Sequence, residues 1–250
     1  MRVLVVTAVP AERDAVARAF GDGAGQSAHQ VPGAGIHRVD APGGAGRFDI
    51  LAGGAGPAAA AAATAFALAA GHRPGPDAAP YDLVVSAGIG GGFAPVAPVG
   101  SLVVASRIVA ADLGAQTPEG FVPVTALGFG RDQYLPPRSL VREAAGATGA
   151  LAAGILTVST VTGGAGRAAA LRAAHPDAAA EAMEGFGVAE AADRTGTPVL
   201  EIRAVSNAVG PRDRDAWRIG DALAALTGAF GKLVPVLEGW NRRTGRLDPS

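Results

Sequence analysis

Two short polar segments stand out in a chain that is otherwise rich in alanine and glycine. Residues 182–187 read Ala-Met-Glu-Gly-Phe-Gly and open a stretch with helical spacing. Residues 203–207 read Arg-Ala-Val-Ser-Asn and close an apolar stretch that predicts a strand. Open α/β sheets bind ligands beyond the carboxyl ends of their strands, which is where Asn207 is expected. Glu184, opening a helix, offers a carboxylate that can accept hydrogen bonds from both hydroxyls of a diol.

A third carboxylate, Glu12, follows the first predicted strand and therefore belongs to the same edge of the sheet. Its segment, 7–12, reads Thr-Ala-Val-Pro-Ala-Glu, with proline at the first turn of a helix. Taken alone, Glu12 is a first-turn glutamate that complements the helix dipole. A general base at the sheet edge is the functional alternative.

Residues 86–93 read Ser-Ala-Gly-Ile-Gly-Gly-Gly-Phe and follow another apolar strand. We expect a loop here, because glycines let the backbone approach a ligand closely and expose its N–H groups. A tight turn into the next strand is the alternative without a function.

The pattern along the chain alternates strand and helix, which predicts a three-layer α/β/α fold of one domain with a mixed, mostly parallel central sheet. We assign residues 1–240 to this domain and expect a frayed tail over 241–250. The expected strands cover 2–8, 36–39, 48–52, 81–86, 101–109, 154–161 and 198–206. The expected helices cover 10–20, 57–70, 137–147, 165–174, 183–195 and 214–238, with 112–133 the least regular stretch.

Composition excludes several classes of protein. The net charge of −1 argues against nucleic acid or an anionic membrane as a partner. The chain has no cysteine, which excludes thiol catalysis, cysteine-based zinc sites and disulfides and favours a cytoplasmic protein. Lys232 is its one lysine and stands in neither a P-loop nor a plausible Schiff-base site. No signal peptide is apparent, and the apolar run 56–70 is too short to span a membrane.

No metal site is expected, since the four histidines share no ligand spacing and we predict that they lie on the surface. They are His29, His37, His72 and His175. The charged run 212–215, Arg-Asp-Arg-Asp, is interpreted as the start of the last helix; the alternative is a lid whose arginines meet an anionic substrate.

In chain order, Glu12, the glycine segment, Met183-Glu184 and Ser206-Asn207 resemble the nucleoside site of the purine nucleoside phosphorylase and nucleosidase superfamily. Within it they are most similar to futalosine hydrolases, and the resemblance covers nearly the whole chain. It implies a homodimer or higher homo-oligomer that needs no cofactor and acts on a small purine nucleoside. The implied reaction splits futalosine into hypoxanthine and dehypoxanthine futalosine, in menaquinone synthesis.

The resemblance also implies a role for each motif. Glu12 would activate the attacking water, and Asn207 would stabilise the departing purine. Glu184 would accept from both ribose hydroxyls, with Met183 beneath the sugar. The remaining substrate contacts would come from Ile89, Gly90, Gly91 and Ser206, and the segment 157–164 would line the base.

Two positions separate this chain from other members of that superfamily. Its phosphorylases usually hold phosphate with an arginine where this chain has Ser86, so we expect water rather than phosphate as the nucleophile. Its adenine-cleaving nucleosidases have aspartate where this chain has Asn207. Asparagine cannot donate a proton to N7 of the purine, but its amide can form hydrogen bonds with a 6-oxopurine.

The main alternative function is a 6-oxopurine nucleoside phosphorylase. A dinucleotide-binding oxidoreductase or a non-catalytic nucleotide-binding module is an alternative of another class. The first strand, however, leads into Thr7-Ala8-Val9-Pro10 and lacks the Gly-x-Gly-x-x-Gly turn of dinucleotide-binding folds.

Overall fold

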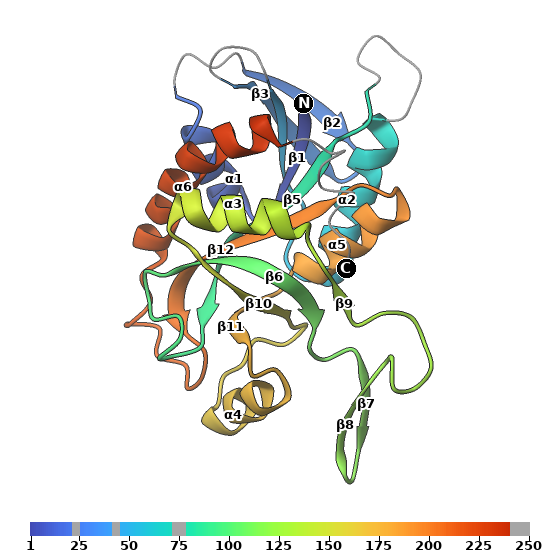
Figure 1. Cartoon of the computed structure of the whole chain (residues 1–250), viewed down its shortest axis with the longest axis vertical. Coiled ribbons are helices and arrows are strands. Elements are labelled where there is room, and N and C mark those ends of the chain that lie inside the picture. The colour runs from blue at the N-terminus through green and yellow to red at the C-terminus, as the bar shows by residue number, and fades with distance from the viewer. Residues whose placement is uncertain (22–25, 42–45, 72–78, 241–250) are drawn as a thin grey trace.

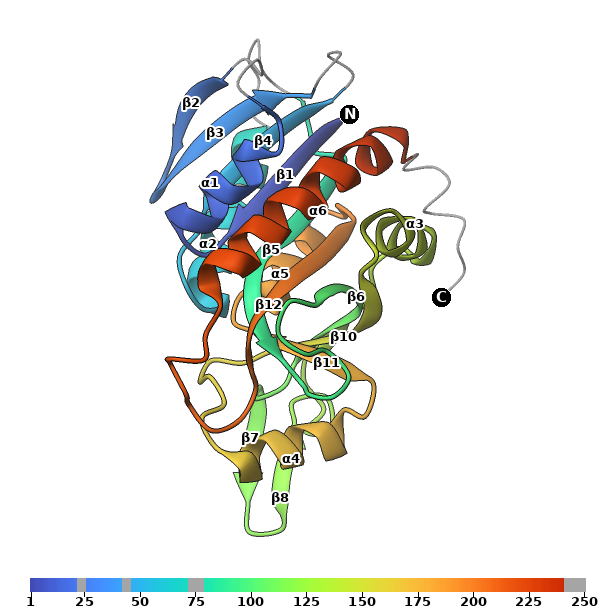
Figure 2. The same cartoon turned by 90° about the vertical axis from the view of Figure 1, so that its left-hand side faces the viewer.

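The fold is an α/β structure in which helices cover both sides of a curved, mixed sheet (Figures 1 and 2). The computed structural model describes residues 1–21, 26–41, 46–71 and 79–240. The expected frayed tail, 241–250, lies outside this part of the chain, as does His72. The other three histidines, His29, His37 and His175, are half-buried rather than fully exposed.

The strands of the main sheet run in the order β11-β10-β6-β12-β5-β1-β4-β3-β2, and β9 pairs with β6. Their bounds are β1 Arg2–Thr7, β2 Gln26–Val31, β3 Ala34–Asp40, β4 Arg47–Ala52, β5 Leu83–Gly92, β6 Leu102–Ala110, β9 Gln133–Tyr134, β10 Leu151–Thr157, β11 Ala178–Ala182 and β12 Val199–Ala208. A separate hairpin, β7 Gly114–Thr117 with β8 Gly120–Pro123, projects from the body of the molecule (Figure 1).

The two sides of the sheet carry different helices. On one side, α6 Ile219–Gly239 packs over β12, β5 and β6, between α1 Pro10–Arg18, which covers β4 and β1, and α3 Arg138–Thr148, which covers β6 and β10 (Figure 2). On the other side, α2 Pro57–Gly71 packs along α5 Gly185–Arg194. A further helix, α4 Ala165–Ala174, lies at the end of the molecule nearest the β7–β8 hairpin (Figure 2). Alanine is abundant in α2, so this helix lies close to its neighbours with little side-chain volume between them.

The sheet also closes on itself at one end. Besides its parallel pairing with β10, β11 pairs antiparallel with β5 through Ala180↔Gly92 and Glu181↔Gly91. Strands β11, β10, β6, β12 and β5 therefore form a ring. This closure was not expected from the sequence, although the parallel pairs β1–β4, β1–β5, β5–β12 and β6–β10 confirm the mixed, mostly parallel sheet.

Several expected boundaries were wrong. The glycine segment is not a loop: β5 continues through Gly92, and its backbone pairs with β12. The strands β2, β7, β8, β9 and β11 were missed, and α5 begins at Gly185 instead of Met183. β10 ends at Thr157 instead of 161, and β12 runs to Ala208, so Asn207 lies within the strand instead of beyond it. The last helix begins at Ile219, so the charged run 212–215 precedes it and is not its first turn.

Within the described residues, α6 is long and apolar enough to cross a membrane by length and composition. Its apolar side chains instead face the protein: Ala222, Leu226, Phe230, Leu233 and Leu237 are buried. The hydroxyl of Thr227 also donates to the carbonyl of Ala15 in α1 at 2.7 Å. These contacts are those of a helix that packs one apolar face against the sheet.

Candidate active site

The polar segments singled out in the sequence meet where β1, β5, β11 and β12 come together. Glu12, on α1, is almost fully buried at 3% exposure. Its Oε2 accepts from the backbone N–H groups of Ala8, at 2.9 Å, and Val9, at 3.3 Å. Its Oε1 accepts from the N–H of Ile89 on β5 at 2.8 Å. Glu12 therefore does cap its helix, but it is also fixed against the central strand of the site.

The Glu12 carboxyl has a raised pKa. Burial is the largest cause, because removing the carboxylate from water disfavours its charged form. Arg203 and the backbone N–H of Ile89 oppose this shift, and the charge of Glu184 adds to it. A carboxyl group held in place with a raised pKa is a stronger base than an exposed glutamate.

Glu184 lies at the N-cap of α5, directly after β11. Its Oε1 accepts from the N–H of Gly56, in the turn between β4 and α2, at 3.2 Å. Its Oε2 accepts from Nη1 of Arg203 at 3.1 Å. Met183, just before it, is half-buried. Glu184 thus joins three segments that are far apart in the sequence.

Arg203 is the central residue of the cluster, and sequence reasoning missed it. Its side chain is 1% exposed and ion-pairs with both Glu184 and Glu201. Its Nη2 donates to Oγ of Ser86 at 2.9 Å. The signal was present in the sequence, because Glu201 and Arg203 are charged residues two apart in an apolar strand and therefore share one face.

Gly88 explains how Glu12 and Arg203 approach each other. A Cβ at this position would lie 2.5 Å from Oε1 of Glu12 and 2.7 Å from Nη1 of Arg203. The side chains of Glu12 and Arg203 thus both contact β5 at Gly88, where no side chain intervenes. Any residue other than glycine would displace one of them.

The glycine segment contributes differently from the expectation. The N–H of Ile89 is already donated to Glu12, and Gly91 pairs with Asn207 and with Glu181 in the sheet. Glycine here allows neighbouring chains to come close: a Cβ on Gly90 would lie 2.7 Å from the carbonyl oxygen of Glu181.

Ser206 and Asn207 lie at an irregularity of β12. The register with β5 shifts between Val205 and Asn207, which leaves Ser206 without a partner on β5. The Ser206 hydroxyl lies 2.8 Å from Oδ1 of Asn207 and 3.2 Å from the carbonyl oxygen of Gly90. The Asn207 amide Nδ2 donates to the carbonyl of Ala208 at 3.1 Å. These contacts leave one amide hydrogen and one lone pair of the Asn207 side chain for a ligand.

The segment 157–164 is tied to the same ring of strands. Thr157 Oγ1 accepts from the N–H of Phe186 at 2.9 Å. The buried Glu181 carboxylate accepts from the N–H of Thr162 at 2.8 Å and from its hydroxyl. Beyond it, the stem of Arg212 lies 3.7 Å from the position of a Cβ on Gly163.

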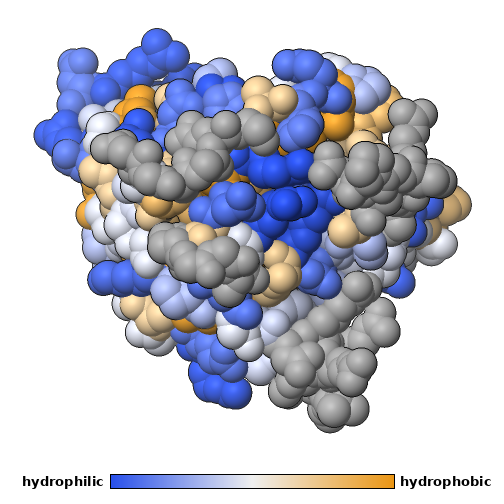
Figure 3. Space-filling model, turned by 90° about the horizontal axis from the view of Figure 1, so that it is seen from above, coloured by the Kyte–Doolittle hydropathy of each residue, from blue (hydrophilic) through white to orange (hydrophobic). Residues whose placement is uncertain are grey.

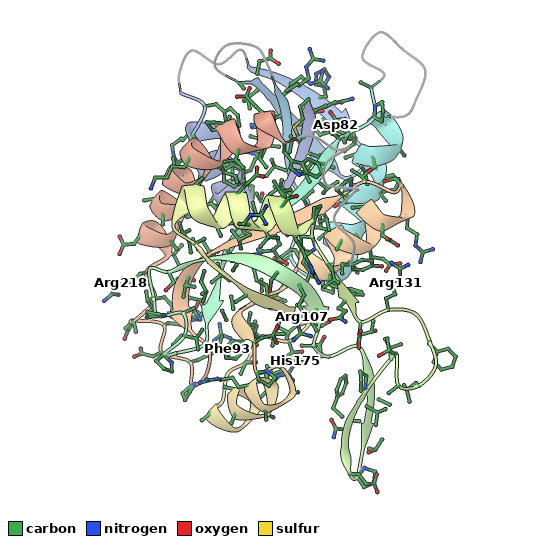
Figure 4. The ribbon with its side chains drawn as sticks, in the orientation of Figure 1. Asp82, Phe93, Arg107, Arg131, His175 and Arg218 are labelled. Atoms are coloured by element: carbon green, nitrogen blue, oxygen red, sulfur yellow. The ribbon has the colours of Figure 1, made fainter. Side chains whose placement is uncertain are left out.

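The charged run 212–215 belongs to the loop between β12 and α6. The guanidinium of Arg212 lies 5.4 Å from the ring centre of Trp217, and that of Arg214 lies 5.8 Å from it. The backbone N–H of Arg218 donates to the carbonyl of Ser206 at 2.8 Å, while its side chain points away from the body (Figure 4). The loop is therefore anchored at the same residue that adjoins Asn207.

A cavity of about 270 Å³ lies next to this cluster but contains none of its carboxylates. It is mainly apolar and lies between α2, α5 and the ends of β6 and β10; its lining includes Pro57, Ala110, Thr157 and Phe186. In the described part of the chain, no group of three or more acidic or histidine side chains forms a potential metal site.

Comparison with known proteins shows the family to which the chain belongs. The sequence pattern of the phosphorylase superfamily matches residues 2–234. The chain belongs to this superfamily. A futalosine hydrolase of Streptomyces coelicolor is 65% identical over 240 residues, which are 96% of this chain and 98% of that protein. A futalosine hydrolase of Acidothermus cellulolyticus is 44% identical over 235 residues, or 92% of this chain and 89% of that one.

Solved structures of the superfamily share the fold. A 5′-methylthioadenosine/S-adenosylhomocysteine nucleosidase of Neisseria meningitidis, in complex with methylthio-immucillin-A, superposes with a TM-score of 0.77 at 20% identity, covering 93% of this chain and 98% of that one. The futalosine hydrolase of Helicobacter pylori also gives 0.77, at 17% identity, covering 94% and 97%. The expected nucleoside phosphorylase-like fold is confirmed, and the dinucleotide-binding alternative is not supported.

Proposed function

We propose that this protein hydrolyses the N-glycosidic bond of futalosine, releasing hypoxanthine and dehypoxanthine futalosine in menaquinone synthesis. The similarity to two futalosine hydrolases, over nearly the full length of both chains, supports the substrate. The observation that carries the chemistry is the buried cluster of Glu12, Arg203 and Glu184 beside Ser86.

That cluster favours water over phosphate as the nucleophile. Its guanidinium, on Arg203, is already paired with Glu184 and Glu201, and Glu12 adds a further carboxylate. A multiply charged phosphate would meet negative charge that is only partly neutralised. Phosphate sites rely instead on arginine forks or lysines that face the anion.

Glu12 and Glu184 have different roles at the sugar. As the glycosidic bond breaks, positive charge develops on the ribose, and the Glu184 carboxylate accepts its hydroxyls and stabilises that charge. Met183, with Ile89, Gly90 and Gly91, borders the sugar. Glu12 takes a proton from the attacking water, whose oxygen bonds to the anomeric carbon. Oε1 of Glu12 has one protein donor, so a lone pair remains for that water.

Asn207 selects the base. The local contacts of its amide leave one acceptor and one donor, the pair required by a 6-oxopurine that carries a proton on N7. Because Asn207 cannot supply this proton, N7 takes it from solvent. Ser206 holds the amide in this orientation. An adenine protonated at N7 presents two donors, and leaving one buried without a partner costs about 1–3 kcal/mol. Hypoxanthine is therefore the preferred leaving group.

We also propose that the enzyme is a cytoplasmic homo-oligomer. Apolar side chains are exposed on α2 and around the β7–β8 hairpin, where Phe66 is 47% and Phe121 43% exposed. They lie on the side of the molecule that carries the apolar cavity, and a second copy would cover them. Size-exclusion chromatography with light scattering measures the molar mass in solution and so tests the oligomeric state. A molar mass equal to that of one chain would contradict the proposal.

Product analysis with excess phosphate tests the reaction itself. Futalosine should yield hypoxanthine and the free sugar product at a rate that phosphate does not change. A sugar 1-phosphate as the main product would instead support the alternative 6-oxopurine nucleoside phosphorylase, which Asn207 also suits.

A further inference from the structure

One buried carboxyl group of the cluster has no part in the proposed chemistry. Glu201, on β12, is 0% exposed. Its Oε1 accepts from Nε of Arg203 at 2.9 Å. Its Oε2 is one of few buried side-chain oxygens without a hydrogen-bond partner among the described residues. Burying a carboxylate oxygen without a donor is costly, so this side chain needs an explanation.

The surroundings of Glu201 connect it to the site on two sides. Across the sheet it is in register with Ser86 of β5, whose hydroxyl accepts from Arg203. On the helix side it is packed against Gly185, where a Cβ would overlap Oε2 of Glu201. Gly185 is the first residue of α5, the helix that Glu184 caps. Glu201 therefore lies behind both Arg203 and Glu184.

We propose that Glu201 is a positioning residue of the hydrolytic site: it holds the Arg203 guanidinium and, by gaining or losing a proton, sets how strongly Arg203 binds Glu184. This inference rests on the proposed function, because its consequence for turnover needs Glu184 to act on the ribose. The contact between Glu201 and Arg203 does not depend on which nucleoside is cleaved.

The charges in the cluster support this role. One guanidinium faces three carboxyl groups: Glu201 on its own strand, Glu184 at the start of α5, and Glu12 on α1. The pKa of Glu201 is raised to about 7, mainly by burial; the positive charge of Arg203 and its hydrogen bond oppose this shift, and the negative charge of Glu184 adds to it. A proton on Oε2 would also explain why this oxygen has no donor.

The two protonation states differ in what Arg203 does. With Glu201 neutral, the charge of Arg203 is directed mainly at Glu184. With Glu201 ionised, Arg203 binds Glu201 more strongly and Glu184 less strongly. The carboxylate of Glu184 is then less neutralised and interacts more strongly with the sugar. Ionisation also adds negative charge near the cationic transition state. We therefore expect kcat to rise as the pH increases through about 7, in addition to any rise due to Glu12.

Two variants separate positioning from structural support. Glu201→Gln keeps an oxygen for Nε of Arg203 but cannot ionise, so it should retain low-pH activity and lose the rise near pH 7. Glu201→Val removes the acceptor, and kcat should fall on the order of 100-fold, as expected when a site group moves by about 1 Å. Asp49→Asn is the matched control: it alters a buried carboxyl group of β4, which pairs with Arg2 and Arg38.

A second measurement does not need turnover. In ¹⁵N-labelled protein, the Nε–H signal of Arg203 should shift with a midpoint near pH 7, and this shift should be lost in Glu201→Gln but kept in Asp49→Asn. An Nε–H signal that titrates alike in wild type and Glu201→Gln overturns the proposal. So does a Glu201→Gln profile of kcat against pH that matches the wild type.

The two proposals fail in different ways. If wild-type enzyme does not release hypoxanthine from futalosine, the proposed function fails, while an Nε–H titration that depends on Glu201 still supports its hold on Arg203. If futalosine is hydrolysed but Glu201→Val keeps wild-type kcat, Glu201 is structural and only this inference fails.

Discussion

At the scale of single residues, Glu12 combines a fixed position with a raised pKa. Replacing it with glutamine should lower kcat by about 10²–10⁴-fold, because the amide cannot take the proton of water. Glutamine also turns its NH2 group either toward the N–H of Ile89 or toward those of Ala8 and Val9, so the variant should lose about 1–3 kcal/mol of stability. Steady-state kinetics below the melting temperature checks this.

The same residue sets the acid limb of the pH profile. Only ionised Glu12 acts as a base, and its raised pKa means that activity should fall as the pH drops, at a midpoint above the usual value of 4.5. Asp14→Asn, on the same helix and half-exposed, is the control and should behave like wild type. A near-normal kcat in Glu12→Gln would show that Glu12 only caps its helix and does not act as a base.

Asn207 should control the choice between purines. Asn207→Asp should narrow the preference for a hypoxanthine over an adenine leaving group, since a protonated aspartate donates to N7 and accepts from the 6-amino group. It should also slow hypoxanthine release, because an ionised aspartate repels O6 as that oxygen gains charge. The measurement is kcat/KM for futalosine and its 6-amino analogue. An unchanged ratio would mean that Asn207 does not contact the base.

The sequence predicted single residues unevenly. Glu12 follows a strand and Glu184 opens a helix, positions that are recognisable without a structure, and both lie beside Arg203 in the fold. Asn207 was expected just beyond a strand but lies near the end of β12, farther along the strand that carries Arg203. Arg203 and Glu201 lie inside a strand, and their partners Ser86 and Glu184 are distant in the sequence. Spacing shows that the two share a face but not what that face meets.

At the scale of secondary structure elements, the errors have a common cause. The segment 178–182, Ala-Ala-Ala-Glu-Ala, has no β-branched residue, yet it forms β11 because β10 and β5 pair with it on either side. Likewise, the glycines of β5 were expected to form a loop but form a strand. In both segments the cause of the error is that local propensity does not reveal pairing with strands that are distant in the sequence.

The segment 157–164 gives a prediction at this scale. Thr162 ties it to Glu181 through both its N–H and its hydroxyl. Thr162→Val removes the second bond and leaves a buried carboxylate oxygen short of a donor, so the segment should loosen, the Kd for hypoxanthine should rise and stability should fall by about 1–3 kcal/mol. Calorimetric titration and thermal unfolding measure both.

The matched control for that variant is Thr148→Val in α3. Thr148 is equally buried, and its hydroxyl donates to the carbonyl of Ala144, far from the candidate site. It should lose stability but bind hypoxanthine as the wild type does. Equal binding by both variants would show that the segment does not line the base.

At the scale of the whole molecule, the described residues form two separate clusters of buried ion pairs. The active-site cluster lies around the β5–β12 pair. The other cluster lies toward the end where β1 begins, where Asp49 accepts from Arg2, Arg38 and the hydroxyl of Tyr81. The surface seen from that end is strongly hydrophilic at its centre (Figure 3), and Asp82 lies there, far from Arg218 (Figure 4).

Asp49 should therefore stabilise the fold without affecting catalysis. Its hydrogen-bonded arginines and Tyr81 lower its pKa despite its burial. Asp49→Asn leaves the two arginines short of a charge partner and should cost about 3–5 kcal/mol, as for other broken buried ion pairs. The exposed pair of Asp40 and Arg47 is the control, and Asp40→Asn should change stability by less than about 1 kcal/mol.

The pH dependence gives that prediction a sign. Because the pKa of Asp49 is lower in the folded than in the unfolded protein, its ionised form stabilises the fold above the ordinary value of 3.8, and this stabilisation is lost as the pH falls through the folded value. Urea unfolding from pH 7 to pH 3 should show the difference in stability between wild type and Asp49→Asn staying constant down to about pH 4 and shrinking below it. Asp49→Asn and Asp40→Asn should both keep wild-type kcat at neutral pH, because the Asp49 cluster is far from the active-site cluster. If the stability curves of wild type and Asp49→Asn stay parallel down to pH 3, Asp49 is not the group that titrates.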